Sequence, residues 1–192
     1  MHLFDFDFSH NDSVTRGNLL VAEPFLNDPN FCRSVIIMCE HQHEMGSFGL
    51  VLNRPTKITI EEVTDNFFLE SQLFIGGPVE QNTLHYIHRF GELENAIPLK
   101  DGLFWGGDYE QLKAMNLNGE LHPENCRFFM GYSGWGEEQL QSELEQHSWI
   151  VSDVDLSWVF SQDPKDLWSN VLKRMGGRFK VYSNYPTDPR LN

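Results

Sequence analysis

The sequence predicts a single α+β domain with a mixed, mainly antiparallel sheet and flanking helices. Two apolar runs, 35–39 (VIIMC) and 48–52 (FGLVL), are separated by a polar bend that ends at Gly46. Neither run alternates polar with apolar residues, which is typical of strands buried on both faces at the centre of a sheet. Several other strands are joined by connections too short for a crossover helix, and this favours antiparallel pairing.

Further strands are expected where short runs of β-branched and aromatic residues lie between turn formers. These runs are 16–22, 73–75, 83–90, 103–105, 126–132 and 149–152. Pro55 is expected to take the chain out of the sheet after the second central strand, because proline has no N–H for a ladder. Residues 1–12 alternate Phe with polar residues and predict an edge strand or an ordered tail, and 30–34 predict one helical turn.

Helices are expected from capping signals and apolar periodicity at 59–67, 108–115, 137–147 and 163–176. The last is the best defined, with Asp163 at the N-cap, Pro164 at the first position and Gly176 as its stop. Thr59 and Glu62 have the spacing of a capping box. The tail from 177 is expected to be irregular. We therefore predict one domain over 1–192, with its core at about 17–176 and tails at both ends.

The composition limits the classes of function. The 192 residues contain 14 basic and 28 acidic side chains, giving a net charge of −14, and no basic run is longer than Lys173-Arg174. Such a charge disfavours nucleic acid and anionic membranes, because both bind proteins largely through Lys and Arg. The three cysteines lack metal-site spacing, and we expect reduced, buried thiols rather than a disulfide framework. With no signal-like N-terminus and no apolar run of membrane-spanning length, a cytoplasmic protein is expected.

Residues 131–135 (GYSGW) follow a strand and precede a helix, which is the context of a nucleophile elbow. The elbow requires G-x-S-x-G, and Trp135 stands where the last glycine is needed. We therefore expect Ser133 and Gly134 to form a tight turn and Trp135 to fill the core. The alternative is that amides at the following helix N-terminus hold an anionic ligand.

No metal or cofactor is predicted. His41 and His43 would point the same way on a strand, which would suit two metal ligands, and Glu40 or Glu44 could serve as a third. Exposed turn histidines are nevertheless the default interpretation. For His85, too, an exposed histidine rather than a metal ligand is the default interpretation. The stretch 76–79 (GGPV) lacks the phosphate-loop patterns and is interpreted as a turn.

Arg33 and Arg54 flank the two central runs, and an arginine at a sheet rim usually pairs with a carboxylate. A ligand-binding role is the alternative for both. The residues that we consider candidates for ligand binding are polar groups at strand ends or turns, namely Arg33, His41, Asn53, Arg54, His85 and Ser133.

Five stretches, in order, resemble the YqgE/AlgH family of small bacterial proteins. They are 17–24 (GNLLVAEP), 28–36 (DPNFCRSVI), 46–55 (GSFGLVLNRP), 76–79 (GGPV) followed by Leu84-His85, and 131–140 (GYSGWGEEQL). The resemblance implies an α+β fold whose bifurcated sheet curls into a partial barrel. It also implies signature positions at Arg33, Asn53-Arg54-Pro55, Gly77-Pro78, His85 and Gly134-Trp135. Members are often labelled transcriptional regulators, and no catalytic residues are agreed for them.

Three hypotheses follow. The first is a non-enzymatic binding or regulatory protein that acts on a protein partner or a small ligand. The second is an enzyme or ligand-binding protein that uses the rim of the central hairpin, with His41 or His85 as acid or base. The third is direct DNA binding, which the net charge of −14 and the lack of a DNA-binding motif oppose.

Overall fold

A computed structural model of the chain describes residues 14–42, 45–65, 67–153, 158–161 and 163–185. The strands are β1 Leu19–Ala22, β2 Val35–Gln42, β3 Gly46–Val51, β4 Pro55–Thr59, β5 Gln72–Ile75, β6 Val79–His88, β7 Ile97–Pro98, β8 Phe104–Trp105, β9 Cys126–Trp135 and β10 Trp149–Ser152. The helices are the 3-10 turn η1 Ile60–Glu62, α1 Tyr109–Leu117, α2 Gln139–Glu145, α3 Trp158–Ser161, α4 Pro164–Met175 and α5 Gly177–Tyr182. The expectation for 1–12 lies outside the described residues.

The ten strands form one mixed sheet in the order β10-β1-β2-β3-β9-β6-β8-β7, with β5 on β9 and β4 on β5. Every pair is antiparallel except β5 with β9. The predicted α+β class and the mainly antiparallel sheet are confirmed. Because the strand order has two free ends, the sheet does not close into a barrel.

The central hairpin β2–β3 is confirmed. Ile36 pairs with Val51 and Gln42 with Gly46, and a register shift interrupts the ladder between Met38 and Glu40. Residues 35–39 are fully buried, as the absence of alternation predicts.

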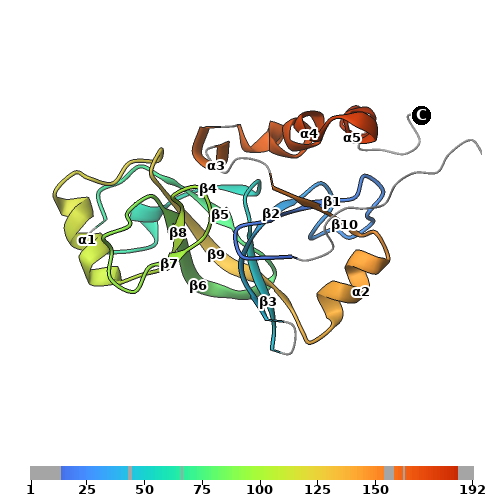
Figure 1. The fold of residues 1–192 in the computed structure, drawn as a ribbon. Helices are drawn as coiled ribbons and strands as arrows, with labels where there is room; N and C mark the ends of the chain where they lie inside the picture. The colour runs from blue at the N-terminus through green and yellow to red at the C-terminus, as the bar shows by residue number, and fades with distance from the viewer. Residues whose placement is uncertain (1–13, 43–44, 66, 154–157, 162, 186–192) are drawn as a thin grey trace, which may run out of the picture.

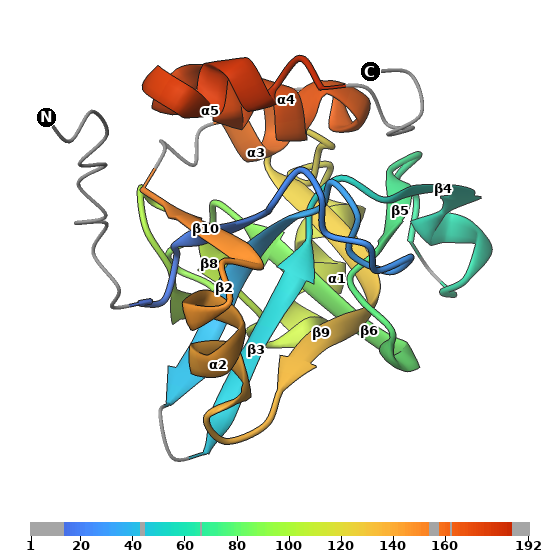
Figure 2. The same cartoon turned by 90° about the vertical axis from the view of Figure 1, so that its right-hand side faces the viewer.

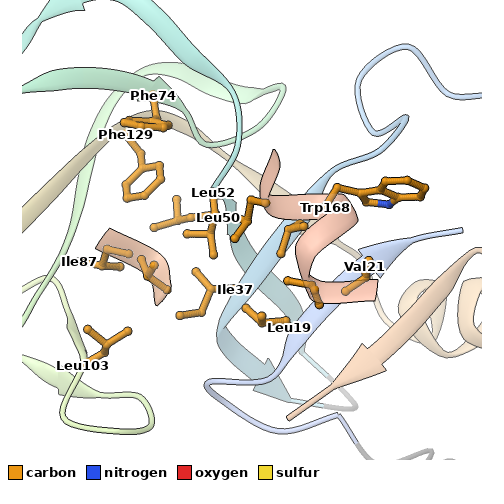
Figure 3. Close-up of a cluster of buried hydrophobic side chains, with 14 of the residues drawn as sticks. Leu19, Val21, Ile37, Leu50, Leu52, Phe74, Ile87, Leu103, Phe129 and Trp168 are labelled. Carbon is orange, nitrogen blue, oxygen red and sulfur yellow. The ribbon is translucent and has the colours of Figure 1, made fainter. Parts of the chain in front are cut away.

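Alternate residues of the strands enter different cores. One face carries a cluster that includes Ile37, Leu50 and Phe129 together with Leu167 and Trp168 from α4 (Figure 3). Figure 1 places α3, α4 and α5 as a layer over this face, with α1 and α2 at opposite ends of the sheet. The three C-terminal helices therefore cover one face as a unit.

The remaining buried residues form two separate clusters. Phe128 packs with Leu112 of α1, whereas Ile36 and Met38 pack with Leu140 of α2. Two smaller cores therefore lie toward opposite ends of the sheet, each with its own helix (Figure 1).

Two expectations about where regular secondary structure ends are wrong. Pro55 does not leave the sheet but begins β4, where Pro55 is paired with Phe74. An edge strand accepts proline as its first residue because the missing N–H is not needed there. The tail after Gly176 also continues as α5, whose Phe179 is buried in the main core.

The capping box at Thr59 starts only the single turn η1. The Glu62 carboxylate accepts the Thr59 backbone N–H at 2.7 Å, as predicted. The helix expected over 59–67 ends at Glu62, and Val63 and Phe67 do not share a buried face, because Phe67 is buried while Val63 is 44% exposed. At the other caps, Asp108 accepts the Gln111 N–H at 2.7 Å and Asp163 accepts that of Lys165 at 2.9 Å.

Candidate functional site

The sheet forks along β9, whose one side carries two different strands in succession (Figure 2). Residues 128–130 pair with β5, and 133–135 pair with β3. Gly76 joins the branches, because its N–H donates to Met130 O and its O accepts the Val51 N–H, both at 2.9 Å. A Cβ on Gly76 would lie 2.2 Å from Gly131 O, so the fork requires glycine at this position. The glycines interpreted as turn formers therefore permit close backbone approach.

Ser133 lies in β9 rather than in a turn, and this corrects the expectation for 133–134. It pairs with Gly49 of β3, is fully buried, and its hydroxyl donates to Gly76 O at 3.1 Å. A hydroxyl held inside the sheet by a backbone carbonyl cannot act as an accessible nucleophile. Trp135 is 5% exposed, so its predicted place in the core is confirmed.

A hollow of about 340 Å³, which we call the fork crevice, lies where the branches separate. It is lined by Pro29, Asn30, Val51, Asn53, Arg54, Pro55, Ile75, Gly77, Pro78 and Gln81. Arg54 is the one charged side chain in this lining. The crevice is therefore a small site, partly apolar, with a single positive charge.

The open end of the central hairpin, residues 33–35 and 51–54, is tied together by side chains that bond to backbone. Asn53 accepts the Val35 N–H and donates to Arg33 O, both at 2.9 Å. Arg54 donates to Cys32 O. Asn53 is 7% exposed, so its amide fixes the chain entering β2 against the chain leaving β3.

Arg33 and Arg54 do not pair with carboxylates in the described part of the chain, contrary to the expectation for rim arginines. Arg33 has φ 55°, donates to Tyr185 O and lies with its guanidinium carbon 4.6 Å from the Trp168 ring centroid. Its role is to hold the C-terminal helices on the sheet. That leaves Arg54 as the arginine facing a crevice.

The bend end of the hairpin, described at residues 40–42 and 45–48, is organised differently. Arg16 donates to both carboxylate oxygens of Glu40, at 2.9 and 3.0 Å. The pKa of Glu40 is lowered by hydrogen bonds from Gln42 and Arg16. His41 Nδ1 lies 2.8 Å from the Ser47 hydroxyl. A wide hollow of about 570 Å³ lies beside this end, and none of the six candidate residues lines it.

His85 lies apart from the crevice among aromatic rings. Its ring centroid is 5.2 Å from that of Phe48, 5.7 Å from Tyr132 and 6.4 Å from Trp105. Its Nε2 is buried and has no hydrogen-bond partner among the described residues, and burial lowers the pKa of His85. Its surroundings are those of a neutral packing residue.

The structure thus brings two of the six candidates, Asn53 and Arg54, to one hollow. Arg33 and Ser133 are held by backbone oxygens, and His41 and His85 lie elsewhere. Sequence patterns do not single out Asn30 and Gln81, which also line the crevice, because both are exposed residues of ordinary turn or strand character.

Two further features are absent from the described residues. Within them, no three His, Cys, Asp or Glu side chains are grouped as metal ligands would be. Nor does that part of the chain contain a helix with the length and apolarity to cross a membrane.

Comparison with known proteins gives concordant matches. The model of the AlgH-like family matches residues 19–180. A UPF0301 protein of Cytophaga hutchinsonii is 48% identical over 93% of this chain and all of its own length. A UPF0301 protein of Bacteroides thetaiotaomicron is 37% identical over 96% of this chain and 94% of its own.

Two solved structures share the fold. A crystal structure of a Corynebacterium diphtheriae protein matches with a TM-score of 0.74 and 26% identity over 90% of this chain and 93% of that one. The solution structure of the AlgH protein from Pseudomonas aeruginosa matches with a TM-score of 0.69 and 26% identity, over 91% and 96% of the two chains.

Proposed function

Because the chain belongs to the AlgH-like family, we propose that it is a non-enzymatic binding protein with a regulatory role whose ligand site is the fork crevice. One observation carries the proposal. Eight of the ten lining residues lie in the stretches on which the family resemblance rests, and five of these are its signature positions, namely Asn53, Arg54, Pro55, Gly77 and Pro78. Motifs that are far apart in the chain thus converge on one hollow.

The chemistry of the lining supports binding rather than catalysis. It contains no Ser, Cys, His, Asp or Glu, the side chains that most often act as nucleophile or acid and base. The Asn53 amide is occupied by two backbone bonds. The crevice offers a ligand a defined shape, one cationic side chain and neutral amides.

A regulatory role of this kind needs no contact with DNA. With a net charge of −14, we expect no shift of a DNA fragment at low salt, even at high protein concentration. A salt-dependent mobility shift would contradict this part of the proposal.

A thermal-shift screen of cytoplasmic metabolites tests the ligand site. We expect compounds that raise the melting temperature of the wild type but not of Asn30→Trp, whose indole would occupy the crevice. Asn118→Trp, an exposed residue after α1, is the matched control and should respond like the wild type. Compounds that stabilise all three proteins equally would place the site elsewhere.

A second candidate function is docking of a protein partner on the segment from β4 to β5. Four exposed apolar side chains, Ile58, Val63, Phe68 and Ile75, lie within these 21 residues, and Phe68 is 73% exposed. The same segment carries four acidic residues, Glu61, Glu62, Asp65 and Glu70, against the single basic Lys57.

A partner with an apolar anchor flanked by Lys or Arg would complement this surface. Its binding should weaken in high salt and be lost in Phe68→Ser. Retention of the partner by Phe68→Ser would exclude the surface.

A further inference from the structure

The fork crevice is unusual in its charge. Acidic residues outnumber basic ones by 28 to 14 in the chain, yet the crevice lining contains one arginine and no acid. A site for a cation or a basic peptide would be lined by carboxylates, which this chain has in excess. The lining of the crevice instead carries one positive charge and no negative charge, which suits an anion.

Arg54 has unused hydrogen-bonding capacity. A guanidinium carries five N–H donors in a fixed plane. Within the described residues, Arg54 makes one hydrogen bond, from Nη2 to Cys32 O, and no ion pair. That bond orients the plane and leaves Nε and Nη1 without a protein partner there. Such an oriented, uncompensated guanidinium suits a carboxylate or phosphate group.

Neutral donors lie in the same lining. Asn30 and Gln81 are exposed residues that both line the crevice, one from the loop before β2 and one from β6. Their side-chain amides can donate to an anion that Arg54 holds. Val51, Pro55 and Ile75 add apolar wall, and the volume of about 340 Å³ is at the small end of ligand sites.

We propose that the fork crevice binds a small organic anion, a carboxylate or a phosphate monoester, through Arg54 with Asn30 and Gln81 as auxiliary donors. This assignment rests on the proposed function, because it names the ligand class of the same crevice. It adds that the charge of the ligand, and not only its shape, decides binding.

The test is a titration of the full chain followed by amide NMR shifts, with inorganic phosphate and butyrate as probes and chloride at equal ionic strength as the reference. We expect saturable shifts around residues 30, 53–54, 76–77 and 81. Phosphate alone would indicate a phosphate monoester, and butyrate alone a carboxylate. Equal shifts with chloride would mean ionic screening only and would overturn the proposal.

Two variants locate the interaction. Arg54→Met should weaken probe binding at least about tenfold, the loss expected for one charge-assisted contact. Gln81→Glu leaves Arg54 in place and adds a carboxylate to the crevice, so it should abolish binding even if Arg54→Met does not fold. Gln146→Glu, an exposed residue after α2, makes the same charge change elsewhere and should bind like the wild type.

The crevice as a ligand site and its preference for anions can be tested separately. Neutral compounds that Asn30→Trp blocks and Gln81→Glu does not affect would overturn the anion assignment and leave the crevice as a ligand site. If none of these variants changes the binding of the compounds or the probes, both the ligand site and the anion assignment are overturned.

Discussion

The two ends of the β2–β3 hairpin are both polar, yet they treat charge in opposite ways. At the bend end, Glu40 is neutralised in place by Arg16, and His41 is matched by Ser47. At the open end, Arg54 bonds to a backbone carbonyl and meets no acid in the described residues. A rim of polar residues is therefore no sign of a site by itself. What distinguishes the open end is a charge that the protein does not compensate.

The largest effect is expected at the fork. Gly76→Ala should destabilise the fold by about 3 kcal/mol, the upper end of overpacking costs, because its Cβ would meet Gly131 O at 2.2 Å. Gly136→Ala, beyond the bend end, would place its Cβ 3.9 Å from Gln139 Oε1, an ordinary van der Waals contact, and should change stability little. Urea unfolding of both variants measures the contrast, and equal losses would show that the fork tolerates a side chain.

Asn53→Ala tests the link across the open end. Truncation leaves the Val35 N–H and the Arg33 O without partners in a buried place, and we expect a loss of about 2–3 kcal/mol in unfolding free energy. Gln42→Ala at the exposed bend end should lose less than about 0.5 kcal/mol. If both variants unfold at the same urea concentration, the two ends do not differ in structural importance.

The next effect concerns pH. Burial lowers the pKa values of His85 and His88, so the folded protein prefers their neutral forms. Their contribution to stability is complete above the unfolded pKa of about 6.5 and declines as pH falls toward the lower folded values. We expect urea unfolding at about pH 5 to show lower stability than at about pH 7.5.

His85→Leu separates the two histidines. Its Nε2 has no hydrogen bond to the part of the chain that the structure describes, so leucine removes a buried polar atom and should reduce the acid-induced loss without harm at neutral pH. His88 should carry the remaining loss, since its Nε2 lies 2.7 Å from Gly106 O and its Nδ1 accepts the Phe90 N–H, which a proton would prevent. An unchanged pH profile in His85→Leu would contradict this account.

The smallest effect is expected from the ion pair at the bend end. Arg16→Met should cost less than about 1 kcal/mol and the loss should shrink in high salt, since both partners are partly exposed. A salt-independent loss of more than about 2 kcal/mol would mean that this pair is as important as the contacts of the open end.

Sequence reasoning predicted the elements whose signals are local. The runs at 35–39 and 48–52 became the central hairpin because unbroken apolar stretches must be buried on both sides. Asp163, Pro164 and Gly176 fixed α4 because capping is decided within one helical turn. These predictions needed no knowledge of distant partners.

Features that depend on distant partners were missed. Gly76 was interpreted as part of a turn, because no pattern states that Gly131 lies against it. Ser133 was placed in a turn, because its strand partner Gly49 is more than eighty residues away. Arg54 was predicted as a candidate from its position at a strand end, but its carbonyl partner and its crevice depend on the loop before β2.

The position of β9 late in the sequence has a consequence for folding during synthesis. The hairpin β2–β3 is complete at residue 51, but its partner β9 ends only at 135, and β10, the partner of β1, follows later still. At roughly 5–20 residues per second, the nascent hairpin would wait several seconds or more for the strand that covers its edge. During that time its apolar faces are open to chaperones and to other nascent chains. We therefore expect folding to be slow, as is typical of sheets built from non-local pairings.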